Sequence, residues 1–93
     1  MGRKARPKPK RLAEKLLQIR NALGVSQGEM FRRLGVEEFS EVKRISDYET
    51  GKNEPPLPVL LAYARLAGVC VEALIDDELD LPAKLPAKQT HKA

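Results

Sequence analysis

The sequence predicts a small all-α protein, a compact domain of five short helices. The chain has 93 residues and a formal net charge of +4, with only two Phe, two Tyr and no Trp. A chain of this length forms one domain with a modest core, here mainly of Leu, Ile, Val and Ala. Apolar residues recur at the three- and four-residue steps of helices, and glycines interrupt the pattern where a helix should end.

The two ends of the chain differ in composition from the middle. Residues 1–11 contain two prolines, which exclude a continuous helix, and we expect a flexible basic arm. Its positive side chains are Arg3, Lys4, Arg6, Lys8, Lys10 and Arg11. Residues 82–93 have no periodicity and are expected to form a disordered tail. Residues 12–81 are therefore the predicted folded domain.

The first helix is expected over residues 12–23. Its apolar residues recur at steps of four, three and four, which places them on one helical face. They are Leu12, Leu16, Ile19 and Leu23. Gly24 ends the pattern, because glycine adopts the left-handed conformation of a helix C-terminus at little cost. Arg20 follows Ile19 and therefore lies at the edge of the apolar face.

A second helix is expected over residues 27–34. Ser26 and Glu29 have the spacing of a capping box, which marks a helix start. The apolar face of this helix consists of Met30, Phe31 and Leu34. Gly35 then interrupts the apolar pattern and indicates a turn.

The third helix is expected over residues 40–50, before Gly51. If Ile45 faces the core, a rotation of about 100° per residue places Val42, Tyr48 and Glu49 within about 60° of it. The opposite, outward face consists of Lys43, Arg44, Ser46, Asp47 and Thr50. A plain surface helix more often pairs Glu with Lys along its outer face. The donor-rich outward face therefore favours contacts with base edges and phosphates.

Two further helices are expected, from about residue 57 to Gly68 and over residues 71–79. The buried side of the fourth is predicted to be Leu57, Leu60, Leu61, Ala64 and Ala67. The fifth should turn Val71, Leu74 and Ile75 inward. The acidic residues at its end are Asp76, Asp77, Glu78 and Asp80. They form either a solvent-exposed helix end or a face that points away from nucleic acid.

Three motifs occur in order along the chain. They are Ser-Gln-x-Glu-Met-x-x-x-Leu-Gly-Val, Ile-Ser-x-Tyr-Glu-x-Gly-Lys-x-x-Pro and Leu-Leu-x-x-Ala-x-x-x-Gly-Val, starting at residues 26, 45 and 60. Together they resemble the Cro/phage-repressor (XRE) family of helix-turn-helix proteins over about residues 12–76. The resemblance implies a lambda-repressor-like fold, sequence-specific binding of double-stranded DNA, and a prokaryotic or phage-type transcriptional repressor.

The resemblance also implies roles for individual residues. Contacts with bases are expected from Lys43, Arg44, Ser46 and Asp47. Contacts with the DNA backbone are expected from Gln27, Thr50, Lys52 and Asn53. By its charge, the basic arm either adds further phosphate contacts or is only a solvated tail. A structural ion pair is expected between Arg20 and Glu49. The family usually binds as a homodimer, at least on DNA, and residues from the fifth helix to Leu85 are the expected contact, through Leu79, Leu81 and Leu85.

The chain departs from the family pattern at two places. Phe31 stands where the family usually has a small residue, and residues 37–40 lengthen the connection to the third helix. We expect the two changes to be coupled, because a longer connection lets the third helix sit further out and makes room for Phe31, with Phe39 packing nearby. In the alternative, the helix register differs and Phe31 points away from the domain.

The composition argues against several other functions. His91 is the only histidine and lies in the tail, and no metal-ligand cluster or phosphate-binding loop occurs, so we expect no enzyme, metal or cofactor. The single cysteine excludes an intramolecular disulfide, and neither an export signal nor a membrane span is predicted, which favours the cytoplasm. The alternative function is a protein-interaction adaptor, such as an antitoxin, in which DNA binding is secondary.

Overall fold

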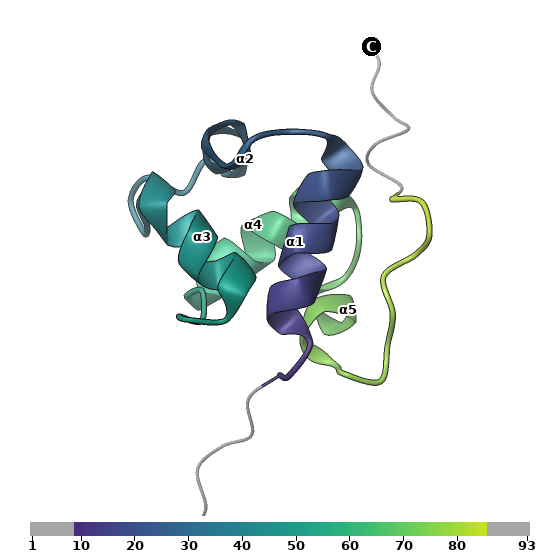
Figure 1. Ribbon diagram of the computed structural model, residues 1–93. Helices are drawn as coiled ribbons and strands as arrows, with labels where there is room; N and C mark the ends of the chain where they lie inside the picture. The colour runs from purple at the N-terminus through teal and green to yellow at the C-terminus, as the bar shows by residue number, and fades with distance from the viewer. Residues whose placement is uncertain (1–8, 86–93) are drawn as a thin grey trace, which may run out of the picture.

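Five helices form the part of the chain that the computed structural model describes, residues 9–85, and no strand occurs in that range. The helices are α1 (Leu12–Leu23), α2 (Gln27–Leu34), α3 (Val42–Thr50), α4 (Leu57–Ala67) and α5 (Val71–Ile75). α1 crosses the middle of the molecule and contacts α3 on one side and α5 on the other, while α4 lies behind it (Figure 1). The predicted all-α, five-helix class is confirmed. Most of the basic arm (Arg3, Lys4, Arg6 and Lys8) and the end of the tail lie outside the described residues.

The core is aliphatic, as the composition predicts. Each helix contributes fully buried side chains, among them Leu16, Ile19, Met30, Ile45, Val59 and Leu74. α1 and α2 have the predicted bounds, and glycines with positive φ end both, Gly24 at 72° and Gly35 at 66°. A side chain is strained in this conformation, so glycine at these positions stops each helix where the sequence indicates.

α3 begins at Val42, two residues later than predicted. The backbone N–H groups of Phe39 and Ser40 both donate to the carbonyl of Val36, and this turn holds residues 37–40 out of the helix. Val42, predicted to face the core, is 48% exposed. It lies in the first turn, about 60° from Ile45, and the packed neighbours of Ile45 do not reach that edge.

The buried face of α4 also differs from the prediction. Leu57 is 79% exposed and Leu61 is 40% exposed, whereas Val59 and Tyr63 are fully buried. The predicted Leu60, Ala64 and Ala67 are buried, and the inward face also includes Val59 and Tyr63. Nearly every residue of this helix is apolar, so the periodicity alone does not identify the face that packs inward.

α5 ends at Ile75 rather than near residue 79. The buried side chain of Lys15 fixes this end, since its ammonium group donates to the carbonyl oxygens of Ala73 at 2.8 Å and Asp76 at 2.9 Å. A helix leaves its last carbonyls without internal partners, and a cation is favoured there. Lys15 therefore joins α1 to α5, a role that no sequence pattern indicated.

The chain after α5 turns back over the core (Figure 1). Leu81 and Leu85 are both buried, the latter 3% exposed, so the packed region continues past the expected boundary at residue 81. These two leucines are thus unavailable as the dimer contact suggested by the sequence. Of the three leucines expected there, Leu79 alone stays exposed.

The acidic segment after α5 binds the start of α1. The carboxylate of Asp77 accepts hydrogen bonds from the backbone N–H groups of Lys10 at 2.9 Å and Arg11 at 3.0 Å. Arg11 in turn forms ion pairs with Asp80 at 2.7 Å and Glu14 at 3.1 Å. The pKa of Asp77 is lowered by these backbone hydrogen bonds, most by that from Lys10 and next by that from Arg11. The pKa of Arg11 is raised by its side-chain hydrogen bonds, most by that to Asp80 and next by that to Glu14. Arg11 therefore belongs to the folded domain and not to a flexible arm.

The substitution Asp77→Asn should lower stability in a pH-dependent way. Because the pKa of Asp77 is lowered by folding, its carboxylate stabilises the folded state above the unfolded-state pKa. That contribution is lost as the pH falls through the folded-state pKa. The difference in urea unfolding midpoint between wild type and Asp77→Asn should therefore be largest at neutral pH. It should shrink to zero as the pH is lowered from about 5 to about 2. Glu78→Gln, one residue away and exposed, is the control; a gap that stays constant with pH would contradict the assignment.

Candidate nucleic-acid interface

The stretch from α2 to α3 is a helix, a glycine turn and a second helix. The Ser26 side chain caps α2 by accepting a hydrogen bond from the backbone N–H of Glu29 at 3.1 Å. The carboxylate of Glu29 does not return to Ser26 as a full capping box would; it binds Arg32 and, at 2.9 Å, Arg33. α2 packs against α3 and α4, so both helices of the motif rest on the same core.

The lengthened connection is folded and tied to α3. The Ser40 hydroxyl lies 2.7 Å from the Tyr48 hydroxyl, and Tyr48 is buried in the last turn of α3. Phe31 is half-buried and packs against the core, so the alternative in which it points away is wrong. Phe39 is 51% exposed, which contradicts the expected packing beside Phe31. The turn formed by Val36, Phe39 and Ser40 carries the Phe39 side chain outward.

The predicted outward face of α3 is open to solvent. Lys43, Arg44, Ser46 and Thr50 are exposed, and Asp47 is half-buried. The two cations have only loose partners within the chain, since Lys43 lies 3.5 Å from Glu41 and Arg44 lies 3.6 Å from Asp47. Exposed pairs of this kind contribute about 0–1 kcal/mol. Both cations can therefore exchange these carboxylates for an external acceptor at small cost.

The end of α3 is hydrogen-bonded to the loop that follows it. The backbone N–H of Lys52 donates to the backbone carbonyl of Asp47 at 2.9 Å. The side-chain amide of Asn53 donates to the carboxylate of Asp47 at 3.0 Å. The Thr50 hydroxyl donates to the carbonyl of Ser46 at 3.0 Å. Asp47 is thus partly committed to holding the loop after α3, which leaves Lys52 and Asn53 in a fixed place beside the outward face.

Arg20, Glu49 and Gln27 form one network that joins α1, α2 and α3. The Arg20 guanidinium makes two parallel hydrogen bonds to the Glu49 carboxylate, at 2.6 and 3.1 Å, and a third to the carbonyl of Val25 at 3.0 Å. The Gln27 side-chain amide donates to the same carboxylate at 3.1 Å. The Glu49 side chain is only 4% exposed and that of Arg20 is 19% exposed. The structure thus brings together the two predicted partners, and adds Gln27, which the sequence had assigned only to the DNA backbone.

The charges of this network lie against a buried phenol. Tyr63 on α4 is fully buried, and burial raises the pKa of its hydroxyl, with a further contribution from the charge of Glu49. The hydrogen bond to Glu49 also raises the pKa of Arg20, while partial burial opposes that change. The ion pair therefore sits at the boundary between the apolar core and the surface that carries the outward residues of α3.

A comparison with known families agrees with this geometry. A family model described as a helix-turn-helix domain matches residues 11–77. The chain belongs to this helix-turn-helix family. Its all-helical, five-helix arrangement fits the lambda-repressor-like fold that the three sequence motifs implied. No curated protein and no solved structure matches the chain.

Other kinds of site find no support in the described part of this helix-turn-helix protein. Between residues 9 and 85, no group of three or more His, Cys, Asp or Glu side chains is arranged to hold a metal ion. Within the same range, no helix combines the length and apolar character that a membrane crossing requires.

The Arg20–Glu49 pair should be strongly coupled in a double-mutant cycle. Breaking a buried pair costs about 3–5 kcal/mol, and Glu49→Ala should fall near the lower end because Arg20 keeps some contact with water. Denaturant unfolding of wild type, both alanine variants and the double variant gives the coupling energy. Glu41→Ala, which removes an exposed partner of Lys43, is the matched control and should change stability little. A coupling below about 0.5 kcal/mol would rule out the structural role.

Proposed function

We propose that this helix-turn-helix protein binds specific sequences of double-stranded DNA and acts as a transcriptional regulator, most simply a repressor in the cytoplasm. The observation that carries the proposal is the exposed, cationic outward face of α3, the second helix of the motif. In helix-turn-helix proteins that helix enters the major groove. The Arg20–Glu49–Gln27 network supports the proposal, because it holds α3 in one orientation relative to α1 and α2.

Base contacts are assigned to Lys43, Arg44, Ser46 and Asp47. Arg or Lys donates to the O6 and N7 atoms of guanine, and a hydroxyl such as that of Ser46 can bind several bases. An Asp carboxylate can accept from cytosine N4. Since Asn53 already occupies one oxygen of Asp47, we assign the larger part of base discrimination to Arg44 and Lys43.

Backbone contacts are assigned to Gln27, Thr50, Lys52 and Asn53. The side-chain amide of Gln27 has two hydrogens, and its bond to Glu49 occupies one of them. The other can donate to a phosphate, beside the free N–H groups at the start of α2. Glu49 thereby orients the Gln27 side chain toward DNA and also forms the ion pair with Arg20. Such contacts fix the register of α3 in the groove without carrying sequence information.

The basic arm is assigned a supporting role in affinity. Arg11 is excluded from it, because Asp80 and Glu14 bind its side chain within the folded domain. Lys10, which is exposed, and the four cations of residues 1–8 remain. A segment of this charge beside the domain adds phosphate contacts or enters a minor groove.

We also propose that the protein binds DNA as a two-fold dimer. Two α3 helices would then occupy successive major grooves about 34 Å apart on a palindromic site. Selection of bound sequences from a random double-stranded DNA pool tests the whole proposal. A recovered motif with two inverted halves about 10 base pairs apart is the expected result. A pool that shows no enrichment would contradict sequence-specific binding, and a single half-site would contradict the dimer.

Replacing the cations of α3 should relax base preference. On the selected site, Arg44→Ala or Lys43→Ala should weaken binding by roughly 1–3 kcal/mol and lose preference at one base position. Binding titrations against the selected site and its single-base variants measure both effects. Arg65→Ala removes an exposed cation from α4 and is the matched control. Wild-type base preference in both α3 variants would show that α3 meets the DNA in a different register.

Removing the charge of the arm should weaken binding to all sequences equally. The variant for this test combines Arg3→Gln, Lys4→Gln, Arg6→Gln and Lys8→Gln. It keeps the chain length and leaves Arg11 in place. Its affinity for specific and random DNA should fall by the same factor, and the slope of log affinity against log salt should become shallower. Salt titrations with wild type and variant provide the measurement. If neither affinity nor slope changes, the arm does not contact DNA.

A further inference from the structure

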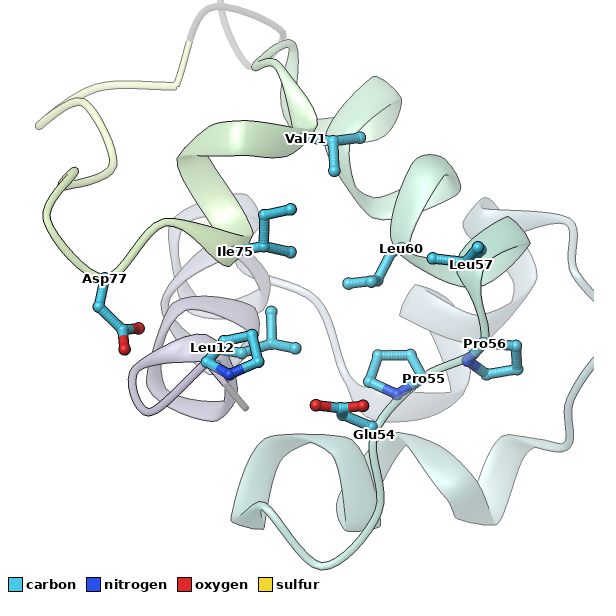
Figure 2. A pocket seen from close by; sticks show the side chains of 10 residues that line it. Leu12, Glu54, Pro55, Pro56, Leu57, Leu60, Val71, Ile75 and Asp77 are labelled. Carbon is cyan, nitrogen blue, oxygen red and sulfur yellow. The ribbon is translucent and has the colours of Figure 1, made fainter. Parts of the chain in front are cut away.

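An apolar groove lies between the start of α1, the start of α4 and α5. It has a volume of about 640 Å³, and its apolar lining includes Leu12, Pro55, Leu57, Leu60, Val71 and Ile75. In Figure 2 the side chains of Leu12, Leu60 and Ile75 point toward its centre, with Pro55 at the near edge. The lining contains none of the residues assigned to DNA. A ligand in the groove would therefore not use the residues assigned to DNA.

The rim of the groove exposes apolar side chains that the sequence pattern predicted to be buried. Leu57 is 79% exposed and Ile75 is 41% exposed, while Leu12 and Leu60 form a buried floor between them. Both exposed residues belong to helical apolar stripes that nothing within residues 9–85 covers. A hollow of this kind with an apolar rim is typical of a surface that binds a partner.

The charges around the groove indicate what kind of partner fits. Both charged residues of its lining are carboxylates, Glu54 and Asp77. Glu72 and Asp76, which follow the lining residues Val71 and Ile75, are also exposed and acidic. Two cations follow the lining residue Pro9 and bind Asp77 through their backbone N–H groups. Arg11 is already paired with Asp80 and Glu14, which leaves Lys10 as a single exposed cation against these four carboxylates. An occupant with apolar residues flanked by Lys or Arg is therefore favoured, and an acidic one is opposed.

We propose that this groove binds a basic amphipathic helix of a partner protein, with its apolar stripe against Leu12, Leu60 and Ile75 and its cations beside Glu54 and Asp76. This interaction goes beyond DNA binding and would let the protein hold a second protein beside its DNA site. A second copy of the chain fits less well, because two acidic rims would face each other. Residues 1–8 of the same chain are basic, yet they contain no Leu, Ile, Val or Phe to fill the groove.

A library of displayed helical peptides, randomised along one face and its flanks, tests the proposal with the full-length protein as bait. Recovered peptides should carry apolar residues at positions i, i+3, i+4 and i+7, flanked by Lys and Arg. Their affinity, measured by fluorescence anisotropy, should fall about tenfold or more in Leu57→Ser and in Ile75→Ser, since each removes an apolar contact of the groove. Replacing the cations of a recovered peptide by Glu should abolish its binding.

Val42→Ser is the matched control, because Val42 is a similarly exposed apolar residue on α3 outside the groove. It should bind the recovered peptides like wild type. Leu57→Ser should keep the wild-type melting temperature and DNA affinity, which separates this test from that of the DNA-binding proposal. Three outcomes would each overturn the proposal. The library could yield no binder, the recovered peptides could bind Leu57→Ser and Val42→Ser with equal affinity, or the protein could form a dimer that Leu57→Ser converts to a monomer.

Discussion

The ion pair between Arg20 and Glu49 is the interaction on which the rest of the structure depends. It joins the first helix to the third at the boundary between the core and the surface, where the carboxylate is almost fully buried. A carboxylate in that position needs a partner that satisfies both oxygens, and the guanidinium group supplies two parallel bonds. This contact fixes the orientation of α3 relative to α1, and therefore the direction in which Lys43 and Arg44 point.

The same carboxylate connects stability with the proposed function. Gln27 donates to Glu49, so the residue assigned to a phosphate is oriented by a group that also holds α1 to α3. A second set of polar contacts closes the other side of the domain, where Asp77 binds the start of α1 and Lys15 binds the end of α5. Each set satisfies helix ends or charges that burial would otherwise leave without partners.

Charge is distributed unevenly over the described surface. Exposed cations lie on the outward face of α3. Exposed carboxylates occur in the connection before α3, at Glu37, Glu38 and Glu41, and again on α5 and the segment after it. The acidic segment binds Arg11 and thereby fixes the point where the basic arm leaves the domain. The apolar groove is lined by two carboxylates and by none of the outward residues of α3, which gives the small domain two chemically different surfaces.

The sequence by itself determined the five helices, the ends of α1 and α2, the outward face of α3 and the partners Arg20 and Glu49. The helices, their ends and the outward face depend on local rules, namely helical periodicity and the backbone freedom of glycine. The pairing of Arg20 with Glu49 was implied by the resemblance to the Cro/phage-repressor family. The start of α3 depended on a turn within residues 36–40 that no local pattern specified. The tertiary structure alone decided which side of the apolar helix α4 packs inward, how Lys15 ends α5, and why Leu81 and Leu85 are buried. Each of these involves residues far apart in the chain or a choice between apolar faces of nearly equal hydrophobicity, and packing decides between them only when the whole domain is assembled.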